Sequence, residues 1–153
     1  MLLPYAAVVP TGDALHVGVR DPLFSNGLAT HLTPSLSAAL AAGLESAVTP
    51  WLAIRAVGGA VNDVAPDATA YAHRHQNFSV TSGGSRAAAF RGYWDELRAE
   101  LDGLYLSFET DERPQRLHDA FPGDTLRRLR EVKARYDPHN VFDQNFPIAQ
   151  GQP

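Results

Sequence analysis

Leucines at a helical spacing form the first clear hydrophobic pattern in the chain. Leu36, Leu40 and Leu44 recur every four residues, which predicts a helix with one apolar face. The helix should begin at the Thr-Pro pair 33–34. Threonine can cap the first turn, and proline is tolerated there because backbone N–H groups of the first turn have no partner within the helix. Pro50 ends the pattern.

Three more helices are expected in the second half of the chain. Between 85 and 104 the apolar side chains fall on one helical face, and Gly103 ends that helix. The face consists of Phe90, Tyr93, Trp94, Leu97, Leu101 and Leu104. A short helix is expected at 115–120, and an arginine-rich helix begins at 123–124 and ends before Pro138. Its expected buried stripe is Leu126, Leu129, Val132 and Tyr136.

Short apolar or alternating runs predict the strands. Residues 2–9 and 14–20 read as two strands around a turn, 51–57 as a third and 104–108 as a short later one. Residues 21–30 are rich in turn-forming residues and predict a loop.

The most informative strand candidate is 69–81. Side chains of a strand alternate between its two faces, so the odd-numbered positions form one almost wholly polar face. That face consists of Thr69, Tyr71, His73, His75, Asn77, Ser79 and Thr81. A polar face is either solvated or the wall of a ligand cavity. Residues 82–85, Ser-Gly-Gly-Ser, read as a flexible link.

The order of these elements predicts an α+β fold. Adjacent strands joined by turns favour an antiparallel sheet covered by helices, followed by a C-terminal helix and tail. The chain has 153 residues, 44% of them hydrophobic, which suits one domain with a real core. The tail from 140 to 153 has no periodicity and must be pinned by contacts or remain loose.

Composition excludes several classes of protein. The net charge of -4 disfavours a general nucleic-acid binder. The absence of cysteine excludes a disulfide framework and a cysteine nucleophile. No run approaches the roughly 20 apolar residues of a membrane helix, and residues 1–10 do not resemble a signal peptide. We therefore expect a cytoplasmic protein with no nucleic-acid or membrane partner.

Two local features offer candidate chemistry. Between 127 and 135 five basic residues accompany one acid, which predicts a solvated helix face and leaves a phosphate-bearing ligand or an acidic partner open. His73 and His75 lie two apart on the predicted strand, so they could share a metal. No third ligand is signalled nearby, and structural or cavity histidines are the stronger interpretation. Our prediction therefore includes no metal.

Three segments resemble one family of enzymes. Residues 129–142, LREVKARYDPHNVF, with Asn145 and Ile148 behind them, resemble the C-terminal signature RLxxVKxxYDPxNxF of the berberine-bridge-enzyme-like FAD-linked oxidases. RAVGGA at 55–60 and DATAYAHR at 67–74 resemble a second stretch of that family, and YLSF at 105–108 resembles its Y-x-N-[YF] strand. The three matches occur in the family's order.

The resemblance implies a domain organisation and a cofactor. Members of the family are much longer than this chain, and their N-terminal half binds FAD. Residues 1–103 would be part of the substrate-binding domain, and 104–153 a C-terminal segment that packs on a flavin domain. The implied partners are a small-molecule substrate and a flavin-binding unit, on a partner chain or a missing N-terminal domain. Alone, the chain should be inactive and bind FAD weakly or not at all.

The resemblance also implies roles for particular residues. The predicted substrate residues are His75, Ser79 and Thr81, and the predicted cofactor-binding residues are Ser107, Asn140 and Asn145. Tyr105 is the candidate proton acceptor. The sequence departs from the family where Ser107 replaces an Asn and Phe108 replaces a Tyr that acts as base in some members, since phenylalanine cannot take a proton. An unidentified residue is therefore an equal candidate for the base.

The implied reaction is oxidation of an alcohol or amine-type substrate by hydride transfer to FAD. The rival interpretation is a stand-alone, non-catalytic binding or interaction domain derived from such an oxidase. In that case the surface that faces the flavin domain in the family would be exposed or paired with another chain.

Overall fold

The computed structural model describes residues 23–144 and 146–148. Its centre is a three-stranded antiparallel sheet of β1 (Leu23–Ala29), β2 (Trp51–Ala56) and β3 (Phe78–Gly84) in the order β1-β3-β2. The last strand in sequence therefore lies in the middle and pairs with both others. The expected α+β class and antiparallel sheet are confirmed.

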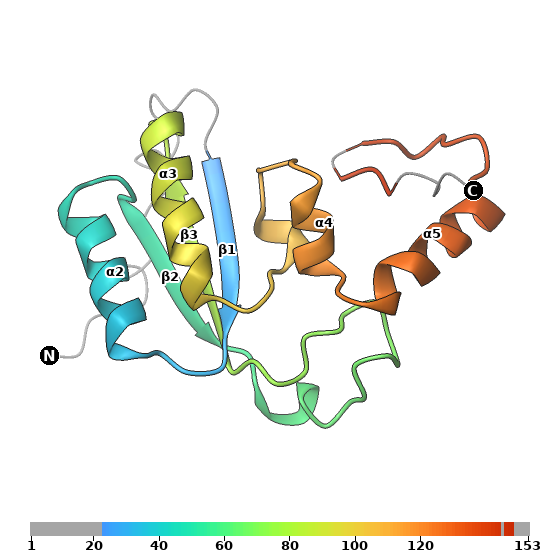
Figure 1. Cartoon of the computed structure of the whole chain (residues 1–153), viewed down its shortest axis with the longest axis horizontal. Coiled ribbons are helices and arrows are strands. Elements are labelled where there is room, and N and C mark those ends of the chain that lie inside the picture. Colours follow the sequence, from blue (N-terminus) through green and yellow to red (C-terminus); the bar gives the residue numbers. More distant parts are fainter. Residues whose placement is uncertain (1–22, 145, 149–153) are drawn as a thin grey trace, which may run out of the picture.

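Two helices, α2 (Pro34–Glu45) and α3 (Ala87–Leu97), run beside the sheet (Figure 1). The core between them and the sheet consists of Ala29, Leu36, Leu40, Val80, Phe90, Trp94 and Leu97. A Cβ on Gly84 would lie 2.5 Å from the ring of Phe90 in α3. Glycine at this position of β3 therefore lets α3 pack closely against the sheet.

The start of α2 follows the sequence prediction. Thr33 caps the helix by accepting a hydrogen bond from the backbone N–H of Leu36 at 3.1 Å, and Pro34 occupies the first turn. The apolar face is shorter than expected, because the helix ends at Glu45, before Pro50, and Leu44 is exposed.

The C-terminal part extends away from the sheet (Figure 1). It contains the 3-10 turn η4 (Leu106–Phe108), the short helix α4 (Gln115–Ala120) and the helix α5 (Asp124–Tyr136). Both helices agree with the predictions. Two further 3-10 turns, η2 (Gly59–Val61) and η3 (Arg98–Glu100), follow β2 and α3.

Three predictions about the central sheet need correction: a loop, a strand and a link. The expected loop at 21–30 is instead β1 from Leu23 onward, because tertiary pairing with β3 overrides its turn-forming composition. The expected strand at 69–81 begins only at Phe78, and the expected link at 82–85 is strand as far as Gly84. The predicted strands at 2–9 and 14–20 lie outside the described residues.

The fourth correction concerns 104–108, which forms the 3-10 turn η4 instead of a strand. Asn26 of β1 explains the difference. Its side-chain amide donates to the Tyr105 carbonyl at 2.9 Å and its side-chain oxygen accepts from the Tyr105 N–H at 2.7 Å. One side chain thus takes both backbone groups of Tyr105 that a neighbouring strand would otherwise bond.

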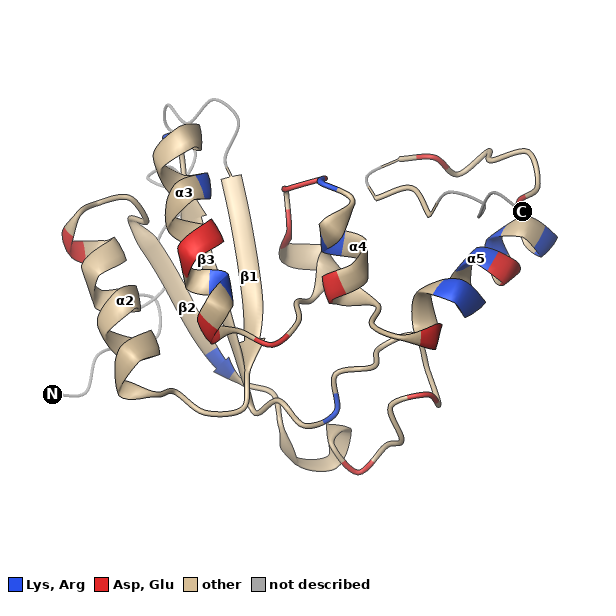
Figure 2. Ribbon diagram, in the orientation of Figure 1, with Lys and Arg blue, Asp and Glu red and all other residues tan. Residues whose placement is uncertain are grey.

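The expected buried stripe of α5 is buried only in its first half. Leu126 is buried and Leu129 is half-buried, but the exposed fraction is 52% for Val132 and 72% for Tyr136. Figure 2 shows the basic residues of α5 interspersed with acids, and Arg127 pairs with Asp124 and Glu131 along the helix. Among the described residues, no helix is long and apolar enough to cross a membrane.

The tail after α5 is pinned by side chains. Asp137 accepts backbone hydrogen bonds from Val141 at 2.7 Å and Phe142 at 3.1 Å. Lys133 pairs with Asp137 and donates to the Phe142 carbonyl at 2.6 Å. Asn140 has φ +52, a left-handed conformation that asparagine tolerates better than most residues. The YDPHN stretch therefore encodes a specific turn.

Candidate functional site

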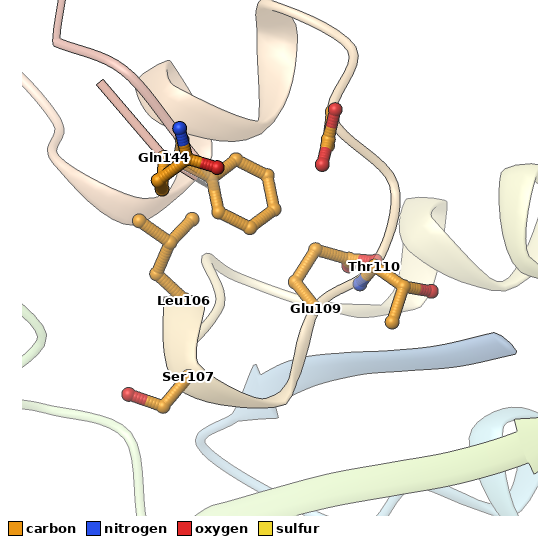
Figure 3. A pocket seen from close by; sticks show the side chains of 7 residues that line it. Leu106, Ser107, Glu109, Thr110 and Gln144 are labelled. Atoms are coloured by element: carbon orange, nitrogen blue, oxygen red, sulfur yellow. The ribbon is translucent and has the colours of Figure 1, made fainter. Parts of the chain in front are cut away.

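Two adjoining cavities lie around η4, and Ser107, Glu109 and Thr110 line both of them. The larger, here the tail cavity, has a volume of about 480 Å³ and is also lined by Leu106, Glu112, Gln144 and Phe146 (Figure 3). The smaller, here the sheet cavity, has a volume of about 260 Å³ and is also lined by Phe24, Trp51, Thr81 and Phe108.

The sheet cavity lies on the side of β3 that faces away from α2 and α3. Val80 belongs to the core beneath the helices, so its neighbours Ser79 and Thr81 point to the opposite face. Gly83 pairs with both Phe24 and Trp51, whose rings meet edge-to-face with centroids 6.1 Å apart. The rings of Phe24 and Trp51 therefore lie on either side of Gly83, which has no side chain and is two residues from Thr81 on the same face of β3.

Backbone hydrogen bonds hold the 107–110 segment over this face. The Thr110 N–H donates to the Phe24 carbonyl at 2.9 Å, and the Thr110 hydroxyl both donates to that carbonyl and accepts from the Phe24 N–H. Together with the bonds from Asn26 to Tyr105, these contacts fix η4 against the outer edge of β1. The cavity is thus built from residues about 80 positions apart.

Glu109 is a buried acid between the two cavities, with an exposed fraction of 7%. Its Oε1 accepts three hydrogen bonds, from the Ser25 hydroxyl at 2.9 Å and from the N–H groups of Thr110 and Asp111 at 2.9 and 2.8 Å. Burial raises the pKa of Glu109, and these hydrogen bonds oppose the rise.

Thr81 has an unsatisfied hydroxyl. The residue is 1% exposed, and its Oγ1 has no hydrogen-bond partner among the described residues. Buried polar groups are almost always hydrogen-bonded, so such a hydroxyl beside a cavity marks a position where a ligand would bond. Thr81, predicted from the sequence as a substrate residue, thus lines the sheet cavity with a hydroxyl that has no partner among the described residues.

The predicted site residues are only partly brought together. Thr81 and Ser107 line the sheet cavity, whereas Ser79 is buried on the same face without lining either cavity. Asn140 is an exposed turn residue whose N–H donates to the Asp137 carbonyl at 3.0 Å, away from the lining residues. Asn145 lies outside the described residues.

His75 precedes β3 and lines neither cavity. Its Nε2 lies 2.5 Å from Asp102 Oδ2, and both side chains are mostly exposed. His73 is instead buried, with Nε2 3.1 Å from the Ala120 carbonyl oxygen, and burial lowers its pKa. The described residues contain no group of three or more His, Asp or Glu that could hold a metal ion.

Tyr105 packs between two aromatic rings and does not line either cavity. Its ring centroid lies 6.3 Å from that of Tyr71 and 5.7 Å from that of Phe108. On Phe108 the Arg55 guanidinium lies 5.1 Å from the ring centroid. Tyr105 thus supports the ring that forms a cavity wall.

Of the lining residues, only Thr81 and Ser107 were predicted from the sequence, and Phe24, Trp51 and Glu109 are among those that were missed. Phe24 fell in the 21–30 segment interpreted as a loop, and Glu109 lay outside every predicted element. The only local signal was at Glu109, which directly follows the YLSF segment that resembles the family's strand.

An ion-pair cluster supports the segment behind the cavities. Arg113 pairs with Asp95 and Asp111, and Arg98 pairs with the same two acids, which ties the end of α3 to the loop before α4. Burial alone would raise the pKa of Asp111, but hydrogen bonds and charge from Arg113 lower it to about 2. The segment after Glu109 is therefore held electrostatically.

The lining residues suit a small organic ligand better than a diphosphate. The tail cavity has two carboxylates, Glu109 and Glu112, and neither cavity has Lys or Arg among its described lining residues. Diphosphates bind where helix N-termini or basic side chains donate hydrogen bonds. The described residues thus do not fit the diphosphate of FAD.

The described residues thus form an α+β fold in which one sheet face and the 105–148 segment line two cavities. Residues 105–149 match the family model "Berberine and berberine like". The chain is 35% identical over 104 residues to the "Uncharacterized FAD-linked oxidoreductase YgaK" of Bacillus subtilis (strain 168), covering 61% of this chain and 23% of the relative. It is 30% identical over 99 residues to YvdP of the same organism, covering 59% and 22%.

The fold agrees with a solved structure, Physcomitrella patens BBE-like 1, with a TM-score of 0.72 at 21% identity over 86% of this chain and 31% of that one. The chain is therefore similar to part of the berberine-bridge-enzyme-like FAD-linked oxidoreductases, and residues 105–149 are the part that matches the family model. It spans less than a quarter of the length of the curated relatives it matches. The expected resemblance is confirmed.

Proposed function

We propose that this chain forms the substrate side of a flavin-dependent oxidoreductase that oxidises an alcohol or amine-type substrate by hydride transfer to FAD. Residues 1–103 would form part of its substrate domain, and 104–153 the segment that packs on the flavin domain. FAD, bound by the rest of the protein or by a partner chain, would supply the hydride acceptor. The observation that carries the proposal is the sheet cavity with the unpartnered Thr81 hydroxyl.

The residues of this chain would bind and orient the substrate. Phe24, Trp51 and Phe108 provide apolar walls that exclude water, and the hydroxyls of Thr81 and Ser107 provide hydrogen bonds. Ser79 would support the same wall from the next position on that face of β3. His75, Tyr105 and Asn140 take no part in this arrangement.

Exposed apolar residues on α5 and the tail support docking on a flavin domain. The set, here called the α5 face, is Val132, Tyr136, Val141 and Phe142. Tyr136 and Val141 are each 72% exposed and Phe142 is 81% exposed. Contiguous apolar surface of this kind favours a covering partner. The same observation supports the second candidate, a stand-alone interaction domain.

The proposal is tested by cofactor retention and substrate reduction. The purified chain, mixed with FAD and desalted, should be colourless because the described residues that line its cavities do not fit a diphosphate. Co-expressed with the flavin-binding part of its own oxidoreductase, from the same gene or an adjacent one, it should form a yellow complex that loses oxidised-flavin absorbance on anaerobic addition of substrate. A partner that forms no complex, or a complex that no alcohol or amine reduces, would favour the interaction domain.

A further inference from the structure

We propose that the sheet cavity binds a positively charged amine through Glu109, so that the substrate is an amine and not a neutral alcohol. This inference rests on the proposed function only in taking the sheet cavity as the substrate site.

Glu109 is the only charged residue among the described residues that line the sheet cavity. All three of its hydrogen bonds go to Oε1, and Oε2 has none among the described residues. A hydrogen-bond donor in the cavity can therefore approach Oε2 without displacing an existing bond. A charged donor forms a bond about twice as strong as a neutral one.

No basic side chain of the described part forms an ion pair with this acid, although the buried Arg116, which pairs with Asp119, acts on Glu109 electrostatically. The nearby Arg98 and Arg113 pair with Asp95 and Asp111. Arg55 lies over the ring of Phe108 but does not line the cavity. Glu109 therefore has no direct ion-pair partner among the described residues, and a cation bound in the cavity would supply one.

The other walls suit the same ligand. Phe24, Trp51 and Phe108 present three aromatic rings, and aromatic faces attract cations. The Thr81 oxygen can accept a hydrogen bond from an N–H group, which would satisfy the buried hydroxyl. A volume of about 260 Å³ lies below the usual range for drug-sized ligands and suits one small amine-bearing group.

The pKa of Glu109 supplies an independent readout. Burial raises this pKa, and a cation bound at Oε2 would lower it again, whereas a neutral ligand that merely excludes water would not. The position of the carboxyl titration, followed by NMR, therefore distinguishes a charged from a neutral occupant.

The experiment compares benzylammonium with benzyl alcohol, which differ in charge but hardly in size. Each probe is titrated into the 153-residue chain at neutral pH, with affinity measured by NMR chemical shifts. We expect benzylammonium to bind at least about tenfold more tightly, a difference of about 1.4 kcal/mol. Glu109→Gln keeps the size and an oxygen acceptor and should abolish this preference.

Glu112→Gln is the matched control, because Glu112 lines the tail cavity but not the sheet cavity. It removes the same charge three residues away and should keep the preference. Equal binding of the two probes, binding of neither, or a preference that survives in Glu109→Gln would overturn the inference. If Glu109→Gln does not fold, the pKa of Glu109 in the unchanged chain must fall with benzylammonium and not with benzyl alcohol.

These outcomes are separate from those of the proposed function, because the titration requires no flavin. If both probes bind equally but the yellow complex is reduced by alcohols, the oxidoreductase proposal stands and the amine inference fails. If benzylammonium binds selectively but no flavin partner assembles with the chain, the amine site stands and the oxidoreductase proposal fails.

Discussion

The sheet with its two helices and the segment from 105 to 148 are stabilised in different ways. The first has a continuous apolar core that includes Val80, Phe90 and Trp94, all at most 1% exposed. The second buries few large apolar side chains and exposes the α5 face. It is held by hydrogen bonds to β1 and by the ion pairs of Asp111. The first part is thus stabilised by a buried core, whereas the second leaves apolar side chains exposed.

The largest expected change in the free energy of unfolding distinguishes the sheet and its two helices from the 105–148 segment. Trp94→Ala removes a fully buried ring and should lower the free energy of unfolding by about 3–5 kcal/mol, measured by urea denaturation. Val132→Ala on the α5 face should change it by less than about 0.5 kcal/mol, because the side chain is already half exposed. Similar losses in both variants would contradict the comparison.

Breaking the ion-pair cluster should have an intermediate effect. Asp111→Asn removes the charge that pairs with Arg98 and Arg113 and should cost about 1–3 kcal/mol. The exposed Asp143→Asn serves as the control and should cost nothing measurable.

The same ion-pair cluster predicts how the free energy of unfolding depends on pH. Because the folded pKa of Asp111 is about 2, below the unfolded value, its contribution is complete above about pH 4. The contribution should be lost as the pH falls toward 2. Urea midpoints measured between pH 5 and 2 should therefore fall more steeply in the parent than in Asp111→Asn. Parallel profiles would show that Asp111 is not stabilised by its partners.

Protonation of His73 should cause a smaller loss of stability, and at a higher pH than that of Asp111. Burial lowers its pKa in the folded chain, so the unfolded chain binds the proton more readily. Stability should therefore decline as the pH falls below the unfolded value of about 6.5, until the folded pKa is reached. His73→Gln should flatten this part of the profile, measured by urea denaturation between about pH 7 and 5.

The smallest effect is expected at the cavity and has the opposite sign. Thr81→Val replaces a buried, unpartnered hydroxyl with a methyl group of similar size, so stability should be unchanged or rise by about 1 kcal/mol. Binding of a cavity ligand that bonds Oγ1 should weaken. A loss of stability above about 1 kcal/mol would show that the hydroxyl has a partner within the fold.

The sequence by itself determined most of the helices and the resemblance to the family. Thr33 and the leucines behind it predict α2, and the 115–120 and 123–138 patterns predict α4 and α5, because caps and helical periodicity act within a few residues. The tail signature points to the family resemblance from neighbouring residues alone. In the structure, Lys133, Asp137 and Asn140 of that signature form a local turn.

Only the tertiary structure decided where the strands pair and which residues meet in the cavity. β1 looks like a loop in isolation, and it becomes a strand because β3, some fifty residues later, supplies its hydrogen bonds. Asn26 converts 104–108 from an expected strand into η4, and Ser25 holds Glu109 in place from 84 residues away. Such contacts depend on register and burial between distant segments, which no local pattern encodes.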